Sequence, residues 1–320
     1  MTRENLVKNF LTNNKLTNYQ IKKIAGDASF RSYYRIFQNN EKDLILMDAP
    51  PLHEDVRPFI KIDEILRKNN FLAPKILASD AENGFLLLED FGDLSYSKAL
   101  RNLSNQDLAI KELELYKKAC DVLINLHQIQ TPQDIPLYDD KLLMNEVMLF
   151  IDWYLPHILK KPATNDQIKQ FQKLFSDLFK KLSQDQKLVL RDYHADNLFV
   201  VNNEVGLLDF QDAVLGSSAY DLVSLLEDAR RDVKKETVEK IIDYYLNEIN
   251  INKCQFLTDY AILSLQRNVK IIGIFSRLAI RDKKESYLNF LPKMFNYVTI
   301  RLQDSLFVDI RELFNNFGLK

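Results

Sequence analysis

The residues best suited to chemistry lie between Leu190 and Asp212, in a segment that begins LRDYHADN and ends LDFQD. Moving a phosphoryl group requires a carboxylate that orients the attacking hydroxyl and accepts its proton. It also requires hard oxygen ligands that hold Mg²⁺ against the nucleotide phosphates. Asp192 has the chemistry of the base, and Asn197 and Asp209 have that of the magnesium ligands. The segment therefore predicts a phosphoryl-transfer site.

These residue types also have a simpler explanation, because Asp and Asn are common in turns, where they bond their own backbone. Three neighbouring features favour chemistry: an apolar strand ahead of the loop, an Asn-Asn pair, and a second acidic strand end. His194 either contacts phosphate or substrate or, as we expect, is a solvated loop histidine. Asp221 precedes an apolar helical run, so it either caps that helix or braces the catalytic loop.

A predicted hairpin positions these candidates. Three short strands are expected, at 188–190, 198–201 and 205–208. Asn202 and Asn203 are a favourable tight-turn pair between the last two strands. A tight turn there would bring the candidate base and the candidate magnesium ligands toward one end of the ribbon.

Composition limits the classes of partner. The apolar fraction of 46% and the charged fraction of 28% are typical of an ordinary globular protein. A formal net charge of −2 gives no basic field for nucleic acid. Cys120 and Cys254 show neither metal-ligand spacing nor a disulfide framework. With no signal peptide and no apolar run of roughly 18 residues, we expect a cytoplasmic protein outside the membrane.

The chain changes character near residue 90. We expect a nucleotide-binding lobe over 1–90, in which a small sheet accompanies a helix at 57–69. We expect a mostly helical lobe over 91–320, which carries the catalytic loop and the substrate site. Its helices are predicted at 106–128, 141–159, 166–182, 236–247, 257–278 and 287–314. The fold class is therefore α+β.

The Asp-x4-Asn loop and the later Asp-led motif resemble the aminoglycoside phosphotransferase and choline kinase superfamily. The resemblance spans nearly the whole chain and implies a two-lobed, protein-kinase-like fold that binds ATP. Residues 123–127 resemble that superfamily's leucine-histidine helix end. Residues 85–89 resemble its hinge approach, which implies that the backbone at Leu88 and Glu89 binds adenine.

A narrower resemblance rests on several motifs in register. The chain is similar to the bacterial anomeric kinases of N-acetylmuramate and N-acetylglucosamine, which act in cell-wall sugar recycling. That similarity implies ATP-dependent phosphorylation of the sugar's C1 hydroxyl. The motifs that carry it are GDASFR from Gly26, MDAPP from Met47, EDVRPF from Glu54, DFQDA from Asp209, YD from Tyr220, QRNVK from Gln266 and GIFSRL from Gly273.

The chain departs from the superfamily pattern at three places. Leu190 stands where the catalytic loop usually begins with histidine, a residue that commonly braces the loop. Met47 stands near the usual phosphate-binding cation, so Arg31 or Arg35 is expected to supply that charge. The phosphate loop has one glycine, Gly26. Its cradle is therefore expected to use the amides of two further residues, Ala28 and Ser29.

A sugar site needs polar groups for the hydroxyls and an apolar wall for the ring. Glu146, Phe150, Trp153 and Tyr154 would share one face of a helix. Aromatic residues at this spacing more often belong to a core than to a site. The acid within the stripe keeps the functional interpretation open, so Glu146, Trp153 and Tyr154 are candidate sugar contacts.

Other candidates flank the metal motif and lie on a later helix. Gln211 and Asp212 follow the magnesium residue and are predicted to reach a sugar hydroxyl. Arg267 and Lys270 would suit an anionic substituent such as a lactyl carboxylate, or could equally pair with acids of the helical lobe.

Two rival functions stay open. One is a kinase of an aminoglycoside, choline or another small alcohol. The other is a degenerate kinase that binds nucleotide or a partner protein without turnover, for which Met47 and Leu190 argue. The sequence leaves the oligomeric state and the choice between the two amino sugars undecided.

Overall fold

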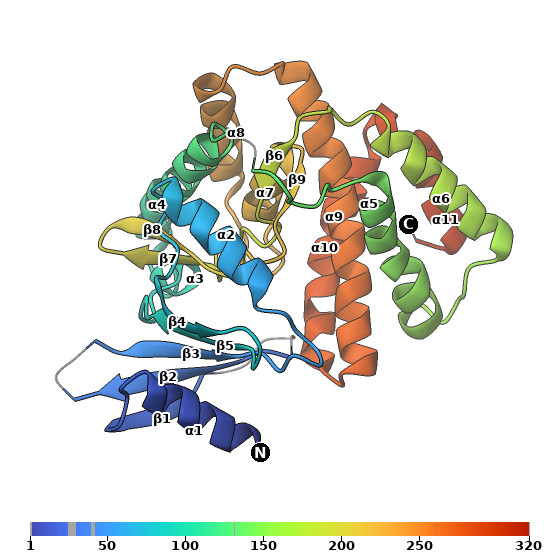
Figure 1. Cartoon of the computed structure of the whole chain (residues 1–320). Helices are drawn as coiled ribbons and strands as arrows, with labels where there is room; N and C mark the ends of the chain where they lie inside the picture. Colours follow the sequence, from blue (N-terminus) through green and yellow to red (C-terminus); the bar gives the residue numbers. More distant parts are fainter. Residues whose placement is uncertain (1, 25–29, 40–41, 131, 320) are drawn as a thin grey trace. The chain divides into compact units, whose positions relative to one another are not determined.

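The structure is a computed structural model that describes residues 2–24, 30–39, 42–130 and 132–319 (Figure 1). It divides into two compact units. Unit 1 comprises Met1–Arg101 and Asp196–Asp212, and unit 2 comprises Asn102–Ala195 and Ala213–Lys320. The boundary expected at residue 90, between a nucleotide-binding lobe and a helical lobe, stays a prediction. The compact units differ from it because residues 196–212, distant in sequence, group with the N-terminal segment.

Unit 1 is built on a five-stranded sheet in which every neighbouring pair is antiparallel. Its order is β1 (Tyr19–Lys23), β2 (Ser32–Gln38), β3 (Leu44–Asp48), β5 (Phe85–Glu89) and β4 (Ile76–Asp80). The two most apolar strands, β3 and β5, lie beside each other, where both sheet faces can be covered. The predicted small sheet is confirmed.

Helix α1 (Arg3–Asn13) packs its Phe10 and Leu11 into the core of this sheet. Arg3 fixes the start of the helix, since its Nε and Nη2 donate to Asp48 Oδ1 at 2.9 and 2.5 Å. Its guanidinium also lies 4.0 Å from the centre of the Phe85 ring. Asp48, the acid of the MDAPP motif, therefore binds the first residue of α1.

The predicted hairpin forms from β7 (Leu198–Val201) and β8 (Glu204–Leu207). Asn202 and Asn203 both have positive φ, 49° and 68°, as the tight turns of hairpins require. The hairpin belongs to unit 1 because Val200 N donates to Leu94 O and Leu207 N donates to Leu72 O. Sequence alone could not indicate these distant partners.

Unit 2 is mostly helical, with one two-stranded sheet of β6 (Lys187–Val189) and β9 (Val214–Gly216). The strand β9 was not predicted. The helices are α4 (Asn105–Leu126), α5 (Asp140–Leu149), α6 (Asn165–Phe179), α7 (Ala219–Leu226), α8 (Lys235–Glu248), α9 (Lys253–Arg281), α10 (Leu291–Leu302) and α11 (Val308–Phe317). Gly273 lets α9 cross close to the end of α5, because a Cβ there would lie 2.4 Å from the Leu149 carbonyl carbon.

Two long helices expected from the sequence are interrupted. The helix predicted over 141–159 is α-helical only to Leu149 and continues as a π-helix, η1 (Phe150–Ile158), which contains Pro156. The helix predicted over 287–314 becomes α10 and α11, with the short 3-10 turns η2 (Glu285–Phe290) and η3 (Ser305–Phe307). Among the described residues, no helix combines the length and apolarity that a membrane span requires.

Candidate active site

Asp221 fixes the start of the candidate catalytic loop in unit 2. It lies within α7, is fully buried, and accepts hydrogen bonds from Leu190 N at 2.6 Å and Arg191 N at 2.9 Å. Burial raises the pKa of Asp221 to about 7, although the two backbone N–H groups oppose that rise. The interpretation of Asp221 as a brace, rather than only a helix cap, is confirmed.

The backbone of the loop turns sharply just before Asp192. Arg191 has a φ of 70°, a left-handed conformation that is uncommon for a side-chain-bearing residue. Ser224 Oγ donates to the Arg191 carbonyl at 3.3 Å, and Asp192 N donates to the Leu190 carbonyl at 2.9 Å. These hydrogen bonds fix the backbone at Arg191 and Asp192, and Asp192 itself is half-buried.

The expectation that His194 is solvated is wrong. The side chain is buried, and its Nε2 lies 3.3 Å from Arg230 Nη1. The next residue is also anchored, since Ala195 N donates to the buried Asp228 at 3.2 Å. His194 therefore belongs to the packing that fixes the loop.

Asn197 and Asp209, the two predicted magnesium ligands, come together in unit 1. Leu208 N donates to the Asn197 carbonyl, and Asn197 Nδ2 lies 3.5 Å from Asp209 Oδ2. Asp209 has a φ of 58°, and its neighbour Phe210 is buried against Phe59, with ring centres 4.8 Å apart. Packing of Phe210 against Phe59 therefore places the adjacent Asp209 carboxylate beside the Asn197 amide.

The donor set suits a hard cation. Among the described residues no group of three or more His, Cys, Asp or Glu is placed to hold a metal ion. Mg²⁺ does not need such a group, because it keeps several waters and takes phosphate oxygens as ligands. One carboxylate and one amide oxygen, from Asp209 and Asn197, are compatible with that coordination.

Of the two arginines considered for the phosphates, Arg31 lies beside Asp209, a predicted magnesium ligand. Its Nη1 is 3.8 Å from Asp209 Oδ1, and its Nε is 3.9 Å from Glu54 Oε2. Arg35 instead pairs with Asp90 at 2.5 Å and with Asp93 at 3.0 Å. Arg31 is therefore the better candidate for the missing cation.

The residues predicted to bind the nucleotide are described only in part. Gly26, Ala28 and Ser29 lie outside the described residues. Leu88 is buried in β5, opposite Ile45 of β3. Glu89 follows it and donates its N–H to the Lys75 carbonyl. The adenine-binding role of this hinge stays a prediction.

The predicted sugar residues separate into different surroundings within unit 2. Glu146 and Lys270 form an ion pair of 2.7 Å inside a buried cluster. Tyr154 packs on the rings of Phe150 and Phe295, and the partly exposed Trp153 lies 5.5 Å from the His157 ring. Phe150 and Tyr154 are neighbours, as their shared helix face predicted, and the sugar-binding role of Glu146, Trp153 and Tyr154 stays a prediction.

Two further candidates for sugar contacts donate hydrogen bonds to groups of the protein itself. Arg267 is buried and donates from Nη1 to the Glu227 carbonyl at 3.2 Å. In unit 1, Gln211 Nε2 donates to Asp209 at 3.0 Å and to the exposed Asp212 at 3.2 Å. Gln211 thus adjoins Asp209, a predicted magnesium ligand. The alternative that Lys270 pairs with an acid is confirmed.

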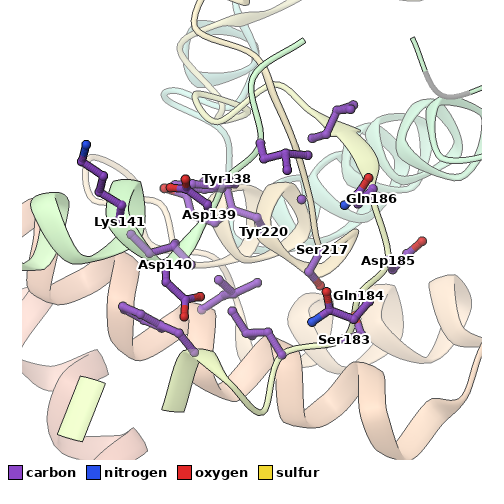
Figure 2. Close-up of a pocket in the computed structure, with 17 residues that line it drawn as sticks. Tyr138, Asp139, Asp140, Lys141, Ser183, Gln184, Asp185, Gln186, Ser217 and Tyr220 are labelled. Atoms are coloured by element: carbon purple, nitrogen blue, oxygen red, sulfur yellow. The ribbon is translucent and has the colours of Figure 1, made fainter. Parts of the chain in front are cut away.

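Unit 2 also contains a pocket of about 470 Å³ that sequence reasoning missed (Figure 2). Tyr138 and Tyr220 lie in its lining, with their rings edge to face at 5.0 Å. The polar side chains around it in Figure 2 come from separate segments, including Asp139, Ser183, Gln184 and Ser217. No local spacing could have indicated this convergence.

Comparisons with known proteins agree with the geometry. Residues 20–257 match the model of the APH phosphotransferase enzyme family. An N-acetylmuramate/N-acetylglucosamine kinase of Pseudomonas aeruginosa is 35% identical over 282 residues, which cover 86% of this chain and 81% of that protein. One of Caulobacter vibrioides is 30% identical over 351 residues, covering 96% and 94%.

Solved structures share the fold. The gentamicin–APH(2″)-IIa complex matches with a TM-score of 0.64 and 16% identity, covering 91% of this chain and 95% of that one. The choline kinase LicA of Streptococcus pneumoniae matches with a TM-score of 0.65 and 12% identity, covering 92% and 98%. These structures have the protein-kinase-like fold, so the predicted fold class is confirmed.

Proposed function

Because the chain belongs to the APH phosphotransferase enzyme family, we propose that it is an ATP-dependent kinase of N-acetylmuramate and N-acetylglucosamine. The acceptor is the anomeric C1 hydroxyl, and the setting is cytoplasmic cell-wall sugar recycling. One observation carries the choice of sugar. Relatives of that name match at 30–35% identity over 81–94% of their own length.

Asp192 is the base in this proposal. It orients the C1 hydroxyl toward the γ-phosphate and accepts the hydroxyl proton as the new O–P bond forms and the bond to ADP breaks. A base is useful only if it is held in the productive geometry. The bonds from Leu190 and Arg191 to the buried Asp221 support that role, because they fix the backbone on which Asp192 stands.

Asn197 and Asp209 would hold Mg²⁺ in the same proposal. Bound there, the ion would neutralise charge on the β- and γ-phosphates during transfer. Arg31, 3.8 Å from Asp209, would supply the positive charge for the phosphates, because Met47 stands in place of the usual basic residue. The amides of Gly26, Ala28 and Ser29 would cradle phosphate, and the backbone at Leu88 and Glu89 would bind adenine.

For the sugar, Gln211 and Asp212 remain the candidates beside the metal residues, and Trp153 remains a candidate ring wall. Tyr154 and Arg267, the other candidates, make their contacts with the protein interior, which favours a packing role over direct contact with the sugar. Glu146 and Lys270 are better explained by another role, developed below.

An acceptor panel tests the proposal. The purified protein with Mg-ATP is offered N-acetylmuramate, N-acetylglucosamine, choline and kanamycin, and ADP release is measured. We expect turnover on one or both amino sugars. Turnover only on choline or kanamycin would remove the sugar assignment. The absence of turnover on all four would favour a degenerate kinase.

A further inference from the structure

Arg191, the residue before the proposed base, is held by the protein at three points. Its N–H donates to Asp221, its carbonyl accepts from Ser224, and its Nη2 donates to Glu146 Oε1 at 2.5 Å. Its φ of 70° is a strained conformation that persists only where the surroundings determine it. The side-chain bond to Glu146 is therefore part of what fixes the loop.

Glu146 has no capacity left for a substrate hydroxyl. Its Oε1 accepts from Arg191 and from Lys270 at 2.7 Å, and its Oε2 accepts from Tyr138 and from Gln266 at 2.9 Å. A carboxylate has about four lone-pair sites, so these four donors saturate it. Only 8% of the side chain is exposed.

Charge connects this cluster to the base. Burial alone would raise the pKa of Glu146, but Lys270 and Arg191 hold it down at about 2, so the carboxylate stays ionised. Burial would lower the pKa of Lys270. The neighbouring Tyr220, Glu146 and Asp192 together raise it despite Arg191. The cluster has two cations and one carboxylate, and Asp192 lies within electrostatic reach of the excess positive charge.

We propose that Glu146 and Lys270 are positioning residues that hold Arg191, and through it Asp192, rather than sugar ligands. Glu146 fixes the guanidinium, and Lys270 keeps Glu146 ionised while it donates to Tyr220 Oη at 3.1 Å. This inference rests on the proposed function to the extent that Asp192 is the base. A displacement of about 1 Å can cost roughly 100-fold in rate, so the anchor has a measurable consequence.

The matched control is Glu112, another buried carboxylate of unit 2. It accepts from Arg231, from Lys234 N at 3.1 Å and from Thr237 Oγ1 at 2.8 Å. These partners follow α7 in the chain and are not part of the catalytic loop. Glu112→Gln therefore removes a comparable buried charge without releasing Arg191.

The first measurement compares steady-state kinetics and thermal unfolding of Glu146→Gln, Lys270→Met and Glu112→Gln on the best acceptor. We expect kcat of Glu146→Gln to fall about 30- to 100-fold, with both KM values changed less than about threefold. Lys270→Met should show a smaller effect of the same kind. Glu112→Gln should lose stability and keep kcat. A sugar KM raised tenfold in Glu146→Gln with kcat unchanged would overturn the proposal, as would equal kcat losses in Glu146→Gln and Glu112→Gln.

The second measurement does not depend on the acceptor. Hydrogen exchange of the Leu190 and Arg191 amides should quicken by about tenfold or more in Glu146→Gln and stay unchanged in Glu112→Gln. Unchanged exchange in Glu146→Gln, or equal acceleration in both variants, would overturn the positioning role. If the wild type phosphorylates none of the acceptors, the proposed function fails, and the exchange result still decides the role of Glu146.

Discussion

The two ends of the candidate catalytic segment are built differently. In unit 2, the residues before and after Asp192 are tied to buried carboxylates by bonds of 2.5 to 3.2 Å. In unit 1, Asp209 is partly exposed, and the side-chain amide of Gln211 donates to it from Nε2 at 3.0 Å. Beyond Gln211, Asn197 Nδ2 lies 3.5 Å and Arg31 Nη1 lies 3.8 Å from the Asp209 carboxylate, whose side chain is 29% exposed. The proposed base is therefore held by buried carboxylates, whereas Asp209, a proposed magnesium ligand, is partly exposed to solvent.

The contrast has a physical meaning. Catalytic groups aimed in advance cost no reorganisation at the moment of reaction, and buried carboxylates bonded to backbone N–H groups provide that rigidity. A pair of oxygen ligands for Mg²⁺ needs some freedom, because waters and phosphate complete the coordination. Substitutions of Asp192 and of Asp209 should therefore affect the kinetics in different ways.

The largest effect is expected from Asp192→Ala. Loss of the base should lower kcat by about 1,000-fold or more, since positioned proton transfer and orientation are both removed. The affinity for Mg-ATP should change little, because unit 1 supplies the proposed metal contacts. Single-turnover kinetics and nucleotide titration would measure the two quantities. Near-normal turnover would show that Asp192 is not the base.

Asp209→Asn should come next, with the opposite signature. Loss of the carboxylate should lower kcat by at least about 100-fold and weaken the binding of Mg-ATP as well. The Mg²⁺ concentration for half-maximal rate should rise. A titration of rate against Mg²⁺ tests this expectation. An unchanged midpoint would mean that Asp209 does not hold the ion.

Asp221→Asn should cost about tenfold in kcat. One amide oxygen cannot replace two carboxylate oxygens, so one of the two loop N–H groups loses its acceptor, at about 1–3 kcal/mol. The control is Asp259→Asn, which alters a buried carboxylate bonded to Ser183 and Ser217. Both variants should lower the melting temperature. If kcat fell equally in both, Asp221 would have no specific effect on the loop.

The smallest effect concerns stability. Asp63 of α2 (Arg57–Lys68) is buried, and its Oδ1 has no hydrogen-bond partner. Burial raises its pKa to about 7 from an ordinary 3.8. As pH rises above about 4 the unfolded state loses this proton first, so stability falls as pH rises toward and through 7. Below the unfolded-state pKa, the contribution is fully present.

Asp63→Asn cannot titrate, so its melting temperature relative to the wild type should rise between pH 5 and pH 8. The expected gain at pH 8 is roughly 2–4 °C. Differential scanning fluorimetry at a series of pH values measures it. A constant difference across the range would contradict the raised pKa.

Local chemistry was readable from the sequence, and distant pairing was not. The Asn202-Asn203 turn and the apolar strands β3 and β5 follow from short-range preferences, and the structure confirms them. Helix α2, predicted from its apolar spacing, is confirmed as well.

The failures have specific causes. The change from α-helix to π-helix at Phe150 was not predicted, because the apolar spacing of 141–159 fits one continuous α-helix. The partners of Glu146 lie on three other parts of the chain, so spacing could identify the acid but not its role. The buried position of His194 likewise depends on Arg230, which lies far along the sequence.

The most direct test identifies the product. The wild type and Asp192→Ala are incubated with Mg-ATP and N-acetylmuramate, and the sugar phosphate is examined by proton–phosphorus correlated NMR. The account predicts that the wild type places phosphate on C1, seen as coupling between phosphorus and the anomeric proton, and that Asp192→Ala forms about 1,000-fold less. Phosphate on another carbon, or product from Asp192→Ala at the wild-type rate, would contradict it.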